Sequence, residues 1–176
     1  MVWQALAGGG PPPKAPMLTR DGEDLPYVPI RGEKLLGQML RTRLGWLFSR
    51  RPRSGALEML PAYRAGLDAS AAVAAAAIPI ERINAPVLAV AGEADAMWPS
   101  ARMAQALVDR RRQHGGHAAD RLLLLPGAGH FLRPPVTPTT VDRNDSLVSG
   151  GTPQASARGQ RAAWDAVLGF LADTLR

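Results

Sequence analysis

The sequence predicts an α/β fold in which a short parallel sheet is flanked by helices. Two short apolar runs, at residues 87–91 and 122–125, have the composition of strands that are buried on both faces. A helical pattern lies between them, and a strand-helix-strand unit of this kind makes its two strands parallel. The chain has 176 residues, 46% of them hydrophobic, so it can bury one sizeable core.

The first 77 residues predict helices but no long strand. Residues 1–33 are rich in glycine and proline and show no sustained period, so we interpret them as an irregular connection. Helical patterns cover residues 34–49 and 55–77, where Pro61 starts or kinks a helix. We expect segment 34–77 to be a helical, lid-like region.

Residues 78–176 carry the strand-helix-strand unit and a last helix. After the first strand, Ser100 is well placed as an N-cap, and Gly115 and Gly116 end the helix that follows. In the last helix Thr152 is the expected N-cap and Pro153 a first-turn residue. We expect the apolar stripe of that helix to pack against the sheet; its members are Trp164, Val167, Leu168 and Leu171.

The composition narrows the functional classes. The chain has no cysteine, which excludes disulfides, a cysteine metal site and a thiol nucleophile, and fits a cytoplasmic location. Its most apolar stretch, residues 71–80, is far shorter than the roughly 20 residues of a membrane span. We therefore expect no membrane span, no metal and no cofactor.

Positive charge is concentrated in arginine. The formal net charge is +6, and Lys14 and Lys34 are the only lysines. The densest group lies within residues 41–53 and consists of Arg41, Arg43, Arg50, Arg51 and Arg53. Such a run is usually a solvated basic face, although it also suits nucleic acid or ligand phosphates. Because no nucleic-acid motif accompanies the charge, nucleic acid is not the favoured partner.

A carboxylate and an imidazole follow the two predicted strands. Asp95 lies in the loop after the first strand, and His130 lies in the loop after the second. Neighbouring strands are about 4.8 Å apart, and loops after parallel strands emerge at the same edge of a sheet. We therefore expect the two side chains to meet as the acid and base of a hydrolytic triad, which suits acyl transfer. The alternative is that Asp95 caps a turn and His130 is an ordinary, partly buried histidine.

Other polar residues receive structural interpretations. His114 and His117 adjoin the predicted helix end and supply too few ligands for a metal, so we expect surface histidines. Glu93 is expected to orient its loop. The chain contains no Gly-x-Ser-x-Gly elbow; Ser149 comes nearest because it precedes Gly150 and Gly151, but Leu147 stands where the first glycine belongs.

Several segments together resemble one family. They are Ile78–Ile83, Pro86–Leu88, Gly92–Ser100 and Pro126–His130, with Gly150–Pro153, Ala163-Trp164, Val2–Leu6 and Gly22–Tyr27 extending the likeness. These residues resemble the C-terminal catalytic domain of acyl-CoA thioesterases and bile acid-CoA:amino acid N-acyltransferases. The resemblance implies a partial α/β-hydrolase fold over residues 1–176 that lacks the early strands and the nucleophile elbow.

The resemblance also implies site residues. Asp95 matches the triad acid of the family and His130 the triad base. The family's nucleophile, a serine or a cysteine, matches no residue, and the family's N-terminal β-sandwich domain is missing. The chain is thus expected to be a fragment or mis-started gene product, an inactive truncated product, or a subunit completed by another chain.

The expected function is that of a truncated acyl-CoA thioester hydrolase or acyltransferase-like domain, inactive alone. Its substrate class is acyl-CoA or another acyl thioester, with the acyl chain and the acceptor left open. We also expect self-association through an exposed sheet edge. The alternative is a non-catalytic module that uses residues 41–53 to bind the phosphates of coenzyme A or nucleic acid.

Overall fold

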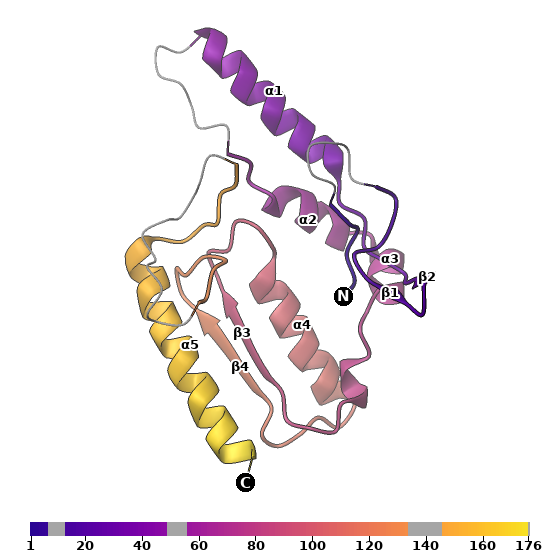
Figure 1. Ribbon diagram of the computed structural model, residues 1–176, viewed down its shortest axis with the longest axis vertical. Coiled ribbons are helices and arrows are strands. Elements are labelled where there is room, and N and C mark those ends of the chain that lie inside the picture. Colours follow the sequence, from indigo (N-terminus) through magenta and orange to yellow (C-terminus); the bar gives the residue numbers. More distant parts are fainter. Residues whose placement is uncertain (7–12, 49–55, 134–145, 176) are drawn as a thin grey trace. The chain divides into compact units, whose positions relative to one another are not determined.

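A computed structural model describes residues 1–6, 13–48, 56–133 and 146–175 of the chain (Figure 1). The chain divides into two compact units, Met1–Ile78 and Pro79–Arg176. No helix in the described part of the chain is both long and apolar enough to cross a membrane.

The described part of the first unit contains helices and a small hairpin. Strands β1 (Thr19–Arg20) and β2 (Glu23–Asp24) pair antiparallel, and helices α1 (Gly32–Phe48), α2 (Leu60–Leu67) and α3 (Ser70–Ala75) follow. A proline in the first turn of α2 confirms the predicted role of Pro61 in starting a helix. The helical pattern over 55–77 is divided, because the chain leaves the helix at Asp68 and resumes it at Ser70.

The core of the first unit draws on its glycine-rich and proline-rich beginning. Trp3 and Val28 are buried and form a bridge, and the ring of Trp3 meets that of Tyr63 edge-on at a centroid distance of 4.7 Å. Residues 1–33, predicted to be irregular, thus contain little regular secondary structure but supply side chains to the core. Helix α1, in contrast, leaves Leu36 and Leu40 exposed.

The second unit contains the predicted strand-helix-strand arrangement. Its elements are η1 (Ile80–Arg82), β3 (Leu88–Gly92), α4 (Ser100–Gln113), β4 (Arg121–Leu125) and α5 (Pro153–Thr174). Strands β3 and β4 pair in parallel, with Leu88 opposite Arg121 and Gly92 opposite Leu125, so the predicted parallel sheet is confirmed. Figure 1 shows the two strands running between α4 and α5.

The helix beginnings agree with the sequence in one case and differ in the other. The Thr152 side chain accepts a hydrogen bond from the Ala155 N–H at 3.2 Å, which confirms it as the N-cap of α5. The N-cap of α4 is Pro99, so the prediction for Ser100 was wrong. Ser100 is the first helical residue, and its hydroxyl turns toward Asp95.

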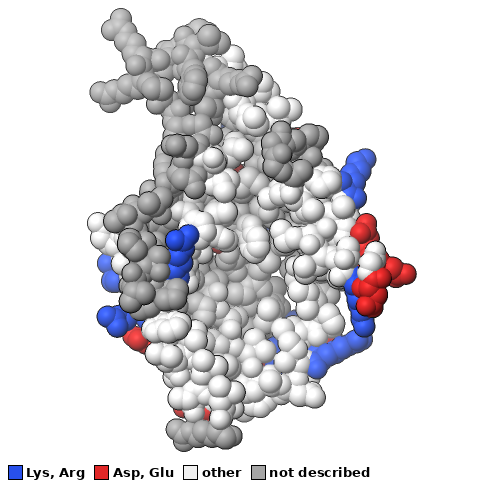
Figure 2. Space-filling view, in the orientation of Figure 1, with Lys and Arg blue, Asp and Glu red and all other residues white. Residues whose placement is uncertain are grey.

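The sheet-facing side of α5 also differs from the prediction. Trp164, Leu168 and Leu171 are exposed, while Ala163 packs with Leu125 and Ala128 in the core of the unit. Small residues allow the helix axis to approach the sheet closely, and the buried positions of α5 are Ala155, Gly159, Gln160, Ala163 and Phe170. Figure 2 shows that the visible face over α5 and the strands is mostly uncharged. The large apolar stripe of α5 is therefore a surface feature.

A buried arginine ties α4 to the segment before β3. Arg111 is 2% exposed and its Nε donates to Asp120 at 2.7 Å. Its terminal nitrogens donate to the carbonyl oxygens of Ile80, Ile83 and Ala85. Asp120 also accepts from the Val87 N–H at 2.9 Å. The pair therefore fixes the entry into β3 and hence the position of the loop that follows this strand.

Candidate active site

The side chains of Asp95 and His130 meet beyond the ends of β3 and β4. The distance between Asp95 Oδ2 and His130 Nδ1 is 2.9 Å. Asp95 is 5% exposed, whereas the His130 side chain is 22% exposed. The expected meeting of the two loops at one sheet edge is therefore confirmed, with the carboxylate inside and the imidazole reaching the surface.

The Asp95 carboxylate receives four hydrogen bonds. Oδ1 accepts from the backbone N–H groups of Met97 and Trp98, at 2.8 and 2.9 Å. Oδ2 accepts from His130 Nδ1 and from the Ser100 hydroxyl. An ionised carboxylate can only accept, so His130 carries its proton on Nδ1 and leaves Nε2 as the proton acceptor.

These contacts control the charge of Asp95. Burial raises the pKa of the carboxyl, but hydrogen bonds from His130, Ser100 and the Trp98 N–H outweigh burial and hold the pKa below its usual range. The group is therefore ionised at neutral pH. A fixed negative charge beside the ring stabilises the imidazolium that forms when Nε2 takes a proton.

We call the loop after β3 that carries Asp95 the acid loop, and the loop after β4 that carries His130 the base loop. A third segment, Ser149-Gly150, joins these two loops and is called the loop clamp. The Ser149 carbonyl oxygen accepts from the Ala96 N–H at 3.3 Å and from the His130 N–H at 2.9 Å. The next residue, Gly150, forms an isolated antiparallel β-bridge with Asp95 and has a φ of +77°. A Cβ on Gly150 would collide with the Ala94 carbonyl oxygen, so only glycine allows this close approach.

Aromatic rings flank the imidazole. The Trp98 ring lies edge-on to that of His130 at a centroid distance of 5.5 Å, and the Phe131 ring does so at 5.1 Å. Phe131 is exposed. These edge-on contacts limit the orientations that the His130 ring can take. Sequence reasoning missed both neighbours, although each lies within three residues of a predicted site residue.

The other polar candidates lie elsewhere. His114 and His117 are exposed, as expected, and His114 Nδ1 lies 2.8 Å from the Arg110 carbonyl oxygen. Within the described ranges no group of three or more acidic or histidine side chains could hold a metal. Glu93 is exposed; its backbone N–H, not its side chain, bonds to the Leu125 carbonyl.

Serine and arginine candidates have separate outcomes. Ser149 is buried in the loop clamp and contributes its carbonyl oxygen, so it does not act as an elbow. Arg50, Arg51 and Arg53 lie outside the described residues. Of the remaining arginines, Arg41 donates from Nε to the Gly37 carbonyl at 3.1 Å. The alternative binding role of residues 41–53 therefore stays a prediction.

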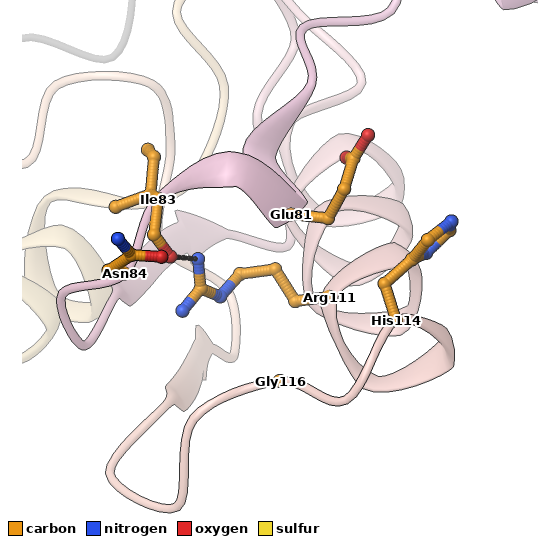
Figure 3. A pocket seen from close by; sticks show the side chains of 6 residues that line it. All are labelled: Glu81, Ile83, Asn84, Arg111, His114 and Gly116. Atoms are coloured by element: carbon orange, nitrogen blue, oxygen red, sulfur yellow. Dashed lines mark hydrogen bonds between the residues drawn. The ribbon is translucent and has the colours of Figure 1, made fainter.

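A polar pocket lies at the other end of α4. Its lining residues are Glu81, Ile83, Asn84, Arg111, His114 and Gly116. Figure 3 shows the Arg111 guanidinium pointing to the Ile83 carbonyl, while Glu81 and His114 point away from it. Among the described residues that line the pocket, Arg111 is paired with Asp120 and Glu81 with Arg110.

Comparisons with known proteins point to one group. A family model described as "BAAT / Acyl-CoA thioester hydrolase C terminal" matches residues 53–176. The mouse "Peroxisomal succinyl-coenzyme A thioesterase" and the rat "Acyl-coenzyme A amino acid N-acyltransferase 2" are each 35% identical over 98 residues. The human "Acyl-coenzyme A thioesterase 6" is 28% identical over 98 residues. These matches cover 53% of the chain but 23% of each relative.

Proposed function

The chain belongs to the BAAT / acyl-CoA thioester hydrolase C-terminal family, and from this premise we propose that it supplies the acid and base of an acyl-thioester hydrolase or acyltransferase. Asp95 is the acid and His130 the base. The observation that carries the proposal is the 2.9 Å hydrogen bond between a buried carboxylate and an imidazole whose other nitrogen is left as a proton acceptor.

The proposed chemistry follows from this pair. His130 Nε2 takes the proton of a serine hydroxyl as its oxygen attacks the thioester carbonyl. The resulting imidazolium is stabilised by Asp95, and it then gives its proton to the coenzyme A sulfur as the carbon–sulfur bond breaks. Water or an amine next attacks the acyl ester, with His130 again as base, and the serine recovers its proton.

We propose that the chain does not turn over alone. It has no Gly-x-Ser-x-Gly elbow and no cysteine, so the attacking group comes from outside these 176 residues. The chain spans about a quarter of the length of the curated relatives that it matches. These relatives include both thioesterases and N-acyltransferases, which leaves the acceptor open between water and an amine.

A hybrid enzyme tests the proposal. Residues 79–176 replace the matching part of the mouse succinyl-coenzyme A thioesterase, and release of the coenzyme A thiol is measured. We expect the hybrid to turn over and the isolated chain not to. His130→Ala in the hybrid should lower kcat by more than about 10³-fold. Full activity of the His130→Ala hybrid would show that His130 is not the base. Turnover by the isolated chain would show that the chain contains a nucleophile.

We also propose that a second copy of the chain pairs with the free edge of β3. Within the described residues β3 pairs only with β4, although it is apolar and its residues Leu88, Ala89 and Val90 are only half-buried. A strand with unpaired backbone groups and apolar side chains readily accepts another strand.

Two further expectations stay predictions. Residues 41–53 as a binding segment for coenzyme A phosphates or nucleic acid remain the alternative function; nucleic acid binding would weaken steeply with salt, whereas free coenzyme A nucleotides would compete for a coenzyme A site. The lid-like role of 34–77 and the cytoplasmic location also stay untested, and relatives carry peroxisomal and mitochondrial names.

A further inference from the structure

We propose that Ser100 is a positioning residue for the acid and base pair: its hydroxyl holds the Asp95 carboxylate in the orientation that presents Oδ2 to His130. The significance for catalysis rests on the function proposed above, but the contact itself can be tested without turnover. The Ser100 hydroxyl donates to Oδ2, the same oxygen that receives the Nδ1–H of His130.

The arrangement of donors explains why the serine is needed. The N–H groups of Met97 and Trp98 hold only Oδ1. Among the described residues, Ser100 and His130 are the donors to Oδ2. The two N–H groups already restrict the rotation of the carboxylate through Oδ1, and the hydroxyl adds a donor on Oδ2 itself, so the oxygen that faces the imidazole is also held independently of the ring.

Ser100 is well anchored for this role. It is the first residue of the 14-residue helix α4, and its partly buried side chain extends from that helix into the acid loop. The buried Arg111, near the other end of the same helix, bonds to Asp120 and to the segment before β3. A donor mounted on a rigid element holds its acceptor more precisely than one on a loop.

The hydroxyl is committed to the carboxylate and to no other role. A serine at a helix start commonly caps backbone N–H groups, but α4 has no side-chain cap at its first turn. A nucleophile would have to face Nε2 of His130, whereas Ser100 shares Oδ2 with Nδ1 on the other side of the ring. Ser100 is therefore neither the cap nor the missing nucleophile.

Nuclear magnetic resonance of the full chain tests the inference. The readouts are the pKa of the Asp95 carboxyl, from its ¹³C shift, and the His130 tautomer, from its ring ¹⁵N shifts. Ser100→Ala should raise the pKa of Asp95, because a hydrogen bond that lowers it is lost, and should reduce the fraction of His130 with its proton on Nδ1. Ser100→Thr keeps the hydroxyl and should restore both values.

Ser156→Ala is the matched control. Its hydroxyl accepts from the Gly129 N–H at 3.3 Å in the base loop, so its loss should leave the pKa of Asp95 unchanged. If Ser100→Ala fails to fold, Ser100→Cys, a weaker donor of similar size, should change both readouts in the same direction. Unchanged values in Ser100→Ala or Ser100→Cys, or an alanine-like result in Ser100→Thr, would overturn the inference.

The hybrid enzyme separates this inference from the proposed function. There, Ser100→Ala should lower kcat by about 10-fold to 100-fold with little change in KM, since a small misplacement of a catalytic group has an effect of that size. An inactive hybrid together with the expected resonance shifts would reject the proposed function and leave the positioning role intact. An active hybrid with unchanged resonance readouts would support the proposed function and reject the positioning role of Ser100.

Discussion

His130 Nδ1 lies 2.9 Å from Asp95 Oδ2, although the two residues are 35 positions apart in the chain. Parallel pairing of β3 with β4 brings their loops to one edge, and the Ser149 carbonyl oxygen bonds to both loops there. The contact is thus a product of sheet topology together with one later segment.

Loss of the buried arginine should strongly destabilise the chain. Arg111→Ala leaves the Asp120 carboxylate buried without its ion pair and frees three carbonyl oxygens, which should lower the free energy of unfolding by about 3–5 kcal/mol. Urea melts measure the loss. Arg112→Ala is the control, because the Arg112 side chain is 66% exposed and should change stability by less than about 0.5 kcal/mol. Equal effects of the two variants would contradict the assigned role of Arg111.

Acid should destabilise the fold through Asp120. Burial raises the pKa of Asp120, but hydrogen bonds from Arg111, His117 and Val87 outweigh burial and bring the pKa to about 2. An unfolded aspartate titrates near pH 3.9, so between about pH 4 and pH 2 the unfolded chain binds more protons than the folded one. Stability from this group is present above pH 4 and is lost as the pH falls through 2.

Urea melts at several pH values check this effect. Asp120→Asn should be less stable than the original chain at neutral pH, and the difference should shrink steadily below pH 4. A constant difference between the two chains from pH 6 to pH 2 would show that Asp120 is not the titrating group.

Substitution of Gly150 should damage the loop clamp. In Gly150→Ala, alanine would have to adopt a left-handed backbone conformation and its Cβ would collide with the Ala94 carbonyl oxygen. We expect the free energy of unfolding to fall by roughly 1–3 kcal/mol or more. Gly115→Ala separates the two causes, because Gly115 has φ +92° but nothing within 4 Å of the added Cβ. The His130 resonances should shift in Gly150→Ala alone; shifts in neither variant would argue against the clamp.

Self-association through the β3 edge should appear in sedimentation. We expect the average mass of the chain to rise with concentration, because strand pairing satisfies open backbone groups. Leu168→Lys places a charge on the exposed stripe of α5 and should leave this rise unchanged. A chain that stays monomeric at all concentrations contradicts strand pairing, and a rise that Leu168→Lys abolishes would place the contact on α5.

Much of the second unit could be predicted because its signals are local. Continuous apolar runs predicted β3 and β4, and a threonine followed by proline predicted the start of α5. The family resemblance is confirmed by the match over residues 53–176. The meeting of Asp95 with His130 could be predicted from parallel topology, although the Ser149 contacts that help to hold the two loops could not. The catalytic roles of these residues stay predictions.

The features that were missed depend on tertiary context. The apolar stripe of α5 was expected to face the sheet because Trp164 and Leu168 are more hydrophobic than Ala163 and Gly159, yet closeness of approach favours the small residues. Ser100 lies where a cap is usual, but a folded loop brings a carboxylate within its reach. Arginine is usually a surface residue, so the sequence does not indicate that Arg111 is buried. Its burial depends on Asp120 and on three backbone carbonyl oxygens that come together only in the folded chain.

The Ser149 carbonyl oxygen, which joins the Ala96 and His130 N–H groups, has a consequence for engineering. Because one carbonyl oxygen bonds to both loops, the carboxylate and the imidazole are held as one preassembled unit. A scaffold that receives this unit needs to align it with the hydroxyl of a nucleophile, instead of positioning two side chains separately.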